Sequence, residues 1–210
     1  MTYGAGGSTR DLTHDSAHVL RRTSGLPVAA HLTCVGASKA ETLEVADSFA
    51  EIGVTDIVAL RGDPENGAPT FTPHADGFAD SVELIEALAK TGKFTLRVGA
   101  YPEPHPESHD QAQNVEWLKR KFDAGADEAI TQFFFETETF LRFRDACAAA
   151  GITKTITPGI MPVTNWKSAR NFATRCGASV PAALDEAYAA AIRDDRHDLL
   201  STALCTEMCS

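Results

Sequence analysis

Five short apolar runs, each followed by an amphipathic helical pattern, constrain this sequence more than any other feature. The runs read as nearly continuous apolar stretches, such as IVAL at 57–60, instead of alternating apolar and polar residues. This pattern is typical of strands in a parallel sheet that is covered on both faces. The repeat therefore predicts an α/β fold built from βα units. The five runs lie at 28–34, 56–61, 95–101, 128–135 and 154–161.

Two architectures share this repeat, the open doubly wound sheet and the closed (β/α)8 barrel. A dinucleotide-binding doubly wound sheet carries a Gly-rich fingerprint after its first strand, but the Gly-rich stretch at 3–8 has too little chain before it for a strand. Polar residues instead stand at the carboxyl end of run after run, where a barrel gathers its active site. We therefore predict a TIM barrel. The polar residues are His31, Thr33, Arg61, Asp63, Tyr101, Glu103, His105, Gln132, Thr164 and Asn165.

The predicted barrel is incomplete within these 210 residues. Eight βα units and about 250 residues are typical of the fold. The sequence shows five units, a strand stub at 1–3 and a last helix at 198–209. We expect one partial TIM-barrel domain over 1–210 that lacks the first strand and helix and the last strand.

Charge and composition argue against several classes of function. The formal net charge of −10 is unfavourable for general nucleic-acid binding, which needs a basic face. The sequence has no run of about 18 apolar residues and no export signal, so we expect a cytoplasmic protein without a membrane span. The five cysteines form no Cys-x-x-Cys pair, which indicates reduced thiols, and we expect no metal site.

Six stretches, taken in order, closely resemble the methylenetetrahydrofolate reductases. They are TYGAGGSTRD (2–11), HLTC (31–34), IVALRGDPENG (57–67), AYPEPHPES (100–108), DAGADEAITQFFF (123–135) and PGIMPVTNW (158–166). The resemblance implies a flavoprotein (β/α)8 barrel that reduces 5,10-methylenetetrahydrofolate to 5-methyltetrahydrofolate, with hydride passing from NADH or NADPH through FAD. Such an enzyme serves folate one-carbon metabolism and methionine biosynthesis, and its relatives commonly form homo-oligomers.

The resemblance also implies a set of site residues. Thr2, Gln132 and Phe172 match substrate contacts, and Asp63 and Gln132 match residues with catalytic roles. The positions that match FAD or nicotinamide contacts are Tyr3, Ala5, His31, Arg61, Gly62, Asp63, Ala75, Tyr101, His105, Asn114, Trp117, Arg120 and Lys121.

The chemistry of these side chains agrees with the implied roles. A carboxylate at Asp63 would stabilise the cationic iminium that forms when the folate ring opens, and so would favour hydride attack. The amide of Gln132 would hydrogen-bond the pterin ring, and Phe172 would close over either bound ligand. Arg120 and Lys121 would supply the positive charge that a diphosphate needs in an acidic protein.

Some features depart from the family pattern. Asn114 stands where an acidic residue is expected, and Ser168 stands where some members carry a folate-contacting glutamine. No residue here matches the general-acid glutamate of the family's first strand. The alternative is therefore a non-catalytic flavin-binding subunit, or a subunit that completes a barrel with another chain. A barrel lyase would need a Schiff-base lysine or a metal cluster at the strand ends, and we find neither in the sequence.

Overall fold

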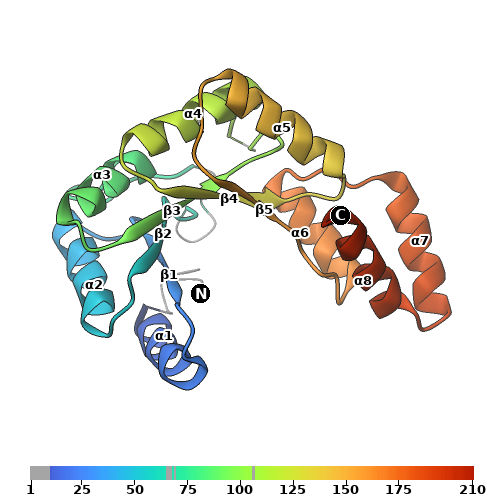
Figure 1. Ribbon diagram of the computed structural model, residues 1–210, viewed down its shortest axis with the longest axis horizontal. Coiled ribbons are helices and arrows are strands. Elements are labelled where there is room, and N and C mark those ends of the chain that lie inside the picture. The colour runs from blue at the N-terminus through green and yellow to red at the C-terminus, as the bar shows by residue number, and fades with distance from the viewer. Residues whose placement is uncertain (1–9, 65–67, 69, 106) are drawn as a thin grey trace. The chain divides into compact units, whose positions relative to one another are not determined.

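The computed structural model describes residues 10–64, 68, 70–105 and 107–210 (Figure 1). Helices and strands alternate up to the helix that follows the fifth strand, as the sequence predicts, and two further helices come after it. The strands are β1 (Ala29–Thr33), β2 (Asp56–Leu60), β3 (Thr95–Ala100), β4 (Glu128–Phe133) and β5 (Ile156–Gly159). The helices are α1 (Arg10–Ser24), α2 (Lys39–Glu51), α3 (Ser81–Thr91), α4 (Gln111–Asp123), α5 (Thr137–Ala149), α6 (Trp166–Cys176), α7 (Ala182–Arg193) and α8 (His197–Met208).

The five strands form one sheet in the order β1-β2-β3-β4-β5. The order in the sheet is the order along the chain, as in a barrel, whereas a doubly wound sheet reverses its order at a switch point. β1 pairs with β2 and β2 with β3 in parallel, so that Ala29 lies opposite Asp56 and Asp56 opposite Thr95. The predicted fold, a parallel α/β sheet of an incomplete (β/α)8 barrel, is confirmed.

The chain divides into two compact units. Unit 1 comprises Met1–Gly99 and Arg120–Ala129, and unit 2 comprises Ala100–Lys119 and Ile130–Ser210. The prediction of a single domain over 1–210 stays a prediction.

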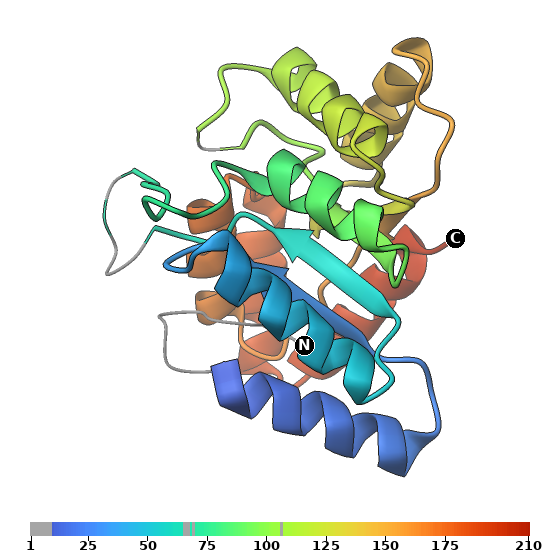
Figure 2. The same ribbon diagram turned by 90° about the vertical axis from the view of Figure 1, so that its left-hand side faces the viewer.

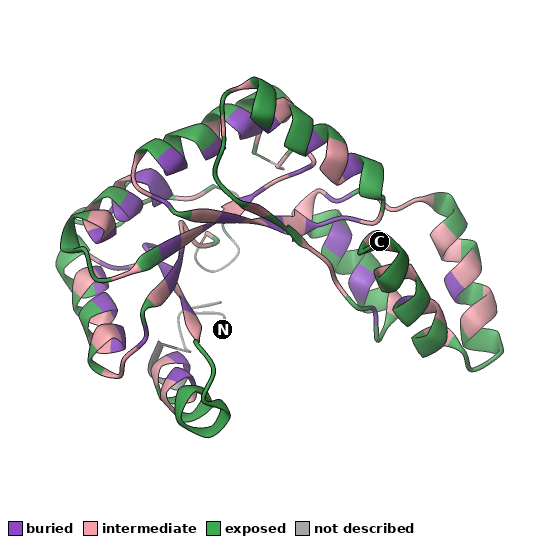
Figure 3. Cartoon of the chain, in the orientation of Figure 1, coloured by how far each residue is buried: buried purple, intermediate pink, exposed green. Residues whose placement is uncertain are grey.

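In unit 1, α2 packs against β1 and α3 against β2, on the outer face of the sheet (Figure 2). Each of these helices turns its buried residues to the strands and its exposed residues outward (Figure 3). The core between them contains the fully buried Phe49 of α2. Its other members include Leu32, Ile57, Leu84, Ile85, Leu88 and Val98.

Unit 2 has two apolar clusters around α6. In one, Phe133 of β4 packs with Ala173 and Ala178. In the other, Val163 and Ala169 pack with Tyr188 of α7. The sequence sets the ends of α6 locally: the side chain of Asn165 accepts a hydrogen bond from the Ser168 N–H at the first turn, and Gly177 ends the helix with φ +74°.

Candidate cofactor and substrate site

The ends of β1 and β2 in unit 1 lie so close together that residue 62 must be glycine. Gly62 has φ +91°, and a Cβ there would lie 2.7 Å from Cγ1 of Val35 and 3.1 Å from Cβ of Thr33. The thiol of Cys34 donates a hydrogen bond to the carbonyl oxygen of Arg61 at 3.3 Å. The Arg61-Gly62 backbone is therefore fixed against the end of β1.

The side chain of Arg61 lies over an aromatic ring in the segment that follows β2. Its guanidinium carbon is 4.8 Å from the ring centroid of Phe71, a distance typical of a cation–π contact. We did not predict Phe71 as a site residue, because a single aromatic residue in a long connection carries no spacing signal.

Lys121 of α4, one of the predicted cofactor contacts, is buried. Only 6% of the residue is exposed, and Nζ donates a hydrogen bond to the carbonyl oxygen of Gly99 at 2.7 Å. Burial and then the charge of Arg61 lower the pKa of Lys121 to about 8. Arg120, the neighbouring cation, is exposed. Unit 1 thus holds Arg61 and Lys121 close enough for each to feel the other's charge.

His31 and Thr33 lie on β1 in the same unit. Burial lowers the pKa of His31 to about 4, so its imidazole is neutral at pH 7 and can both donate and accept a hydrogen bond. Oγ1 of Thr33 is buried and has no hydrogen-bond partner among the described residues.

The remaining predicted residues of unit 1 are exposed or not described. Asp63 follows Gly62 directly and is exposed, so its carboxylate is in contact with solvent. Ala75 is exposed in the connection between β2 and α3. The predicted contacts at Thr2, Tyr3 and Ala5 lie outside the described residues.

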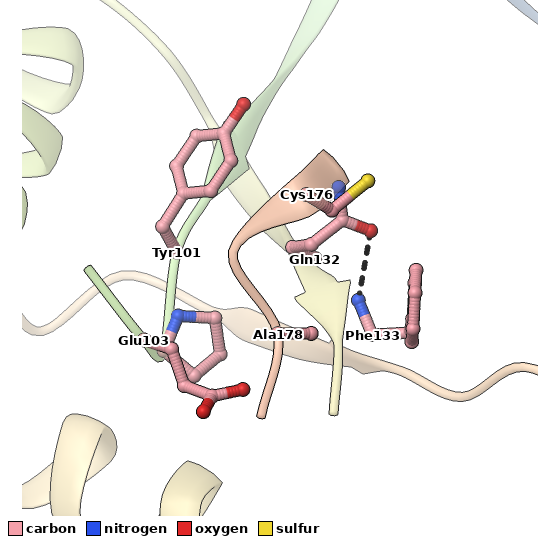
Figure 4. A pocket seen from close by; sticks show the side chains of 7 residues that line it. Tyr101, Glu103, Gln132, Phe133, Cys176 and Ala178 are labelled. Atoms are coloured by element: carbon pink, nitrogen blue, oxygen red, sulfur yellow. Dashed lines mark hydrogen bonds between the residues drawn. The ribbon is translucent and has the colours of Figure 1, made fainter. Parts of the chain in front are cut away.

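Unit 2 contains a small pocket at the carboxyl ends of β3 and β4 (Figure 4). Its empty volume, including the part open to solvent, is about 170 Å³. Oε1 of Gln132 accepts a hydrogen bond from the Phe133 N–H at 3.1 Å, which fixes the side chain at the pocket wall. The lining residues are Tyr101, Pro102, Glu103, Gln132, Phe133, Cys176 and Ala178.

Aromatic contacts order the predicted residues around this pocket. The rings of Tyr101 and His105 meet edge to face, with centroids 4.6 Å apart. Phe172 of α6 stacks on Phe133, with centroids 5.4 Å apart, and is 39% exposed. Phe172 therefore presents an accessible ring beside a residue of the pocket, as a ligand-covering aromatic requires.

Asn114 and Trp117 lie on α4 within unit 2. Asn114 is 7% exposed, and its amide nitrogen donates hydrogen bonds to the carbonyl oxygens of Tyr101 and Glu103. Trp117 is half-buried. Asn114 thus holds the loop after β3, a role that the sequence did not suggest.

The sequence indicated several pocket residues but missed others. Cys176 and Ala178 line the pocket without belonging to a recognisable motif, since Cys176 ends α6 and Ala178 lies just after that helix. Within the described ranges, no group of three or more histidine, cysteine, aspartate or glutamate side chains is placed to bind a metal ion. In those same ranges, no helix has the length and apolar character of a membrane span.

Solved structures of other proteins share this fold. A lyase/mutase homologue from Burkholderia cenocepacia J2315 aligns with a TM-score of 0.50 at 21% identity, covering 86% of this chain and 76% of that one. An uncharacterised protein from Clostridium thermocellum, which binds two copies of 5-methyl-5,6,7,8-tetrahydrofolic acid, aligns with a TM-score of 0.53 at 14% identity over 97% of this chain and 77% of its own. Identities this low establish the fold alone.

Sequence relatives identify the family. The 5,10-methylenetetrahydrofolate reductase of Pectobacterium carotovorum is 45% identical over 182 residues, which are 86% of this chain and 59% of that protein. The Escherichia coli enzyme of the same name is 42% identical over 184 residues, covering 87% of this chain and 60% of its own length. This chain therefore spans about three fifths of these relatives. The family model described as methylenetetrahydrofolate reductase matches residues 1–210, and the chain thus belongs to the methylenetetrahydrofolate reductase family.

Proposed function

We propose that this chain is part of an enzyme that reduces 5,10-methylenetetrahydrofolate to 5-methyltetrahydrofolate, with NADH or NADPH as the hydride donor and FAD as the cofactor. The match to the reductase family over residues 1–210 carries this proposal. A rice relative, 35% identical over 222 residues, is named as an NADH-dependent reductase of this kind. We further propose a cytoplasmic location and self-association into a homo-oligomer.

The residues of unit 1 fit a flavin dinucleotide. Burial and then repulsion from Arg61 lower the pKa of Lys121, and a bound diphosphate would relieve that repulsion. Oγ1 of Thr33, which has no hydrogen-bond partner among the described residues, lies beside Gly62 and could bond a ligand that reaches the ends of β1 and β2.

When bound, FAD supplies the hydride relay between the nicotinamide and the folate. Arg61 and Lys121 would hold its diphosphate. Neutral His31 would offer a hydrogen bond without adding charge. Gln132 would orient a flat heterocycle through its amide, and Phe172 would cover that ring. Asp63 would favour the cationic iminium form of the folate through its negative charge.

The visible absorption spectrum of the gel-filtered 210-residue chain, after incubation with FAD, tests this proposal. We expect a flavin band that elutes with the protein peak. We expect Lys121→Met to weaken FAD binding by about 10-fold to 100-fold, because a charge-assisted hydrogen bond to phosphate contributes about 1.5 to 3 kcal/mol.

Lys119→Met is the matched control, because Lys119 lies on the same helix and is exposed. Equal FAD affinity of the Lys121 and Lys119 variants would contradict the placement of the diphosphate. A second outcome would favour a non-catalytic flavin-binding subunit. In that case the chain would bind FAD but would not reduce the folate, even after it is extended to the full length of its relatives.

A further inference from the structure

The loop after β3 is fixed to α4 through the carbonyl oxygens of three consecutive residues. Nδ2 of Asn114 donates to the carbonyl oxygen of Glu103 at 2.9 Å and to that of Tyr101 at 3.3 Å. Nε2 of Gln111 donates to the carbonyl oxygen of Pro102 at 2.9 Å. Residues 101–103 are therefore held to α4 through their backbone. The Glu103 side chain takes no part in these three hydrogen bonds.

The Glu103 side chain reaches the segment that follows α6. Its Oε1 accepts a hydrogen bond from the backbone N–H of Ser179 at 3.0 Å, although 76 residues separate the two in sequence. Ser179 follows Ala178, which is 8% exposed and lines the same pocket as Gln132. Figure 4 shows the Glu103 carboxylate on the side of the pocket that carries Ala178.

We propose that Glu103 is a positioning residue that links the loop after β3 to the segment after α6 and so fixes the pocket wall that carries Ala178. The inference rests on the proposed function for the identity of the ligand, the folate. The carboxylate does not have to touch that ligand, since it acts through the position of Ala178 and Cys176. The link joins two walls of one pocket with a charge-assisted hydrogen bond.

The chemistry of Asn114 supports this assignment. Its two bonds run to carbonyl oxygens, which only accept, so the side chain at residue 114 must donate. An aspartate of the same shape would place carboxylate oxygens against those carbonyls and would release the loop.

Hydrogen–deuterium exchange of the 210-residue chain tests the link directly. We expect Glu103→Ala to increase the exchange rate of amides in 177–181 about fivefold to tenfold, because the Ser179 N–H loses a charged acceptor. Glu103→Gln should restore most of the protection, since an amide oxygen also accepts. Asn114→Asp should increase exchange in both 101–105 and 177–181.

Glu116→Ala is the control, because Glu116 is exposed on α4 and lies away from the pocket lining. It should leave exchange in both segments unchanged. Unchanged exchange at 177–181 in Glu103→Ala would overturn the proposal.

Binding of 5-methyltetrahydrofolate to the FAD-loaded chain tests the effect on the pocket. We expect Glu103→Ala to weaken folate binding about tenfold, with FAD affinity unchanged and with recovery in Glu103→Gln. Equal folate affinity of wild type and Glu103→Ala would overturn the positioning role and leave the proposed function standing. A wild-type chain that binds neither FAD nor folate would contradict the proposed function, and the role at the pocket would fall with it.

Discussion

In the proposed FAD site, Lys121 would meet two opposing requirements at a single residue. A site for a diphosphate needs a cation, whereas a buried position disfavours one. The residue is 6% exposed and donates to the carbonyl oxygen of Gly99. Its charge is therefore held in the folded chain at a free-energy cost that the unfolded chain does not have.

We predict that this cost appears in the pH dependence of stability. The pKa of Lys121 is about 8 in the folded chain, against 10.5 for an ordinary lysine. Between these pH values the unfolded chain binds more protons, so the free energy of unfolding should rise with pH. Relative to Lys121→Met, the wild type should gain up to about 3 kcal/mol between pH 7 and 10.5.

Urea denaturation of both proteins across this pH range measures the difference. Burial raises the pKa values of Cys34 and Cys147 to about 11, which opposes the rise above pH 9, but the two proteins share these thiols. Their effect therefore cancels in the comparison. A constant difference between wild type and variant at every pH would show that Lys121 titrates normally.

Residues whose partners are remote in sequence escape prediction from sequence. Arg61 and Gln132 were predicted as site residues by their motifs, and the structure places them at the ends of β2 and β4, while their roles stay proposals. The contact of Glu103 with Ser179 could not be predicted, because it depends on the packing of segments 76 residues apart. The burial of Lys121 could not be predicted for the same reason, since its bond to Gly99 joins segments 22 residues apart.

At the scale of elements, local signals predict where a helix ends but not what its end contacts. The sequence predicts that the helix at 114–124 ends before Gly125, and α4 ends at Asp123. The structure adds that Gly125 has φ +117° and that a Cβ there would lie 2.6 Å from Cβ of Ala89 on α3. Hydrophobic periodicity and helix-capping residues therefore predict where the elements lie, whereas close contacts between elements depend on the assembled fold.

Gly125→Ala should lower the free energy of unfolding by more than backbone strain alone would. We expect a loss of about 2 to 4 kcal/mol, because backbone strain and overpacking against Ala89 add together. Gly151→Ala is the matched control: Gly151 follows α5 with φ +81°, and its added Cβ would meet nothing within 4 Å. Thermal and urea unfolding of both variants measures the two costs. If they are equal, the approach to Ala89 contributes nothing.

At the scale of the whole molecule, net charge and the exposed end strand of the sheet have opposite effects on self-association. The chain carries a formal charge of −10, so copies repel one another at neutral pH and low salt. β5 stands at the end of the strand order, and its residues Thr157 and Pro158 are exposed. An exposed end strand is a template for pairing with another chain, and a proline in such a strand blunts that tendency by removing an N–H donor.

We therefore predict that Pro158 limits self-association of the 210-residue chain through β5. Pro158→Val restores the N–H and adds a strand-favouring side chain, so its mean mass in sedimentation velocity should exceed that of the wild type. The excess should grow between 20 and 500 mM NaCl, because salt screens the repulsion that keeps copies apart. Pro162→Val is the control, since Pro162 is also exposed but follows the strand. Equal masses for the two variants at both salt concentrations would show that copies of the 210-residue chain do not meet at β5.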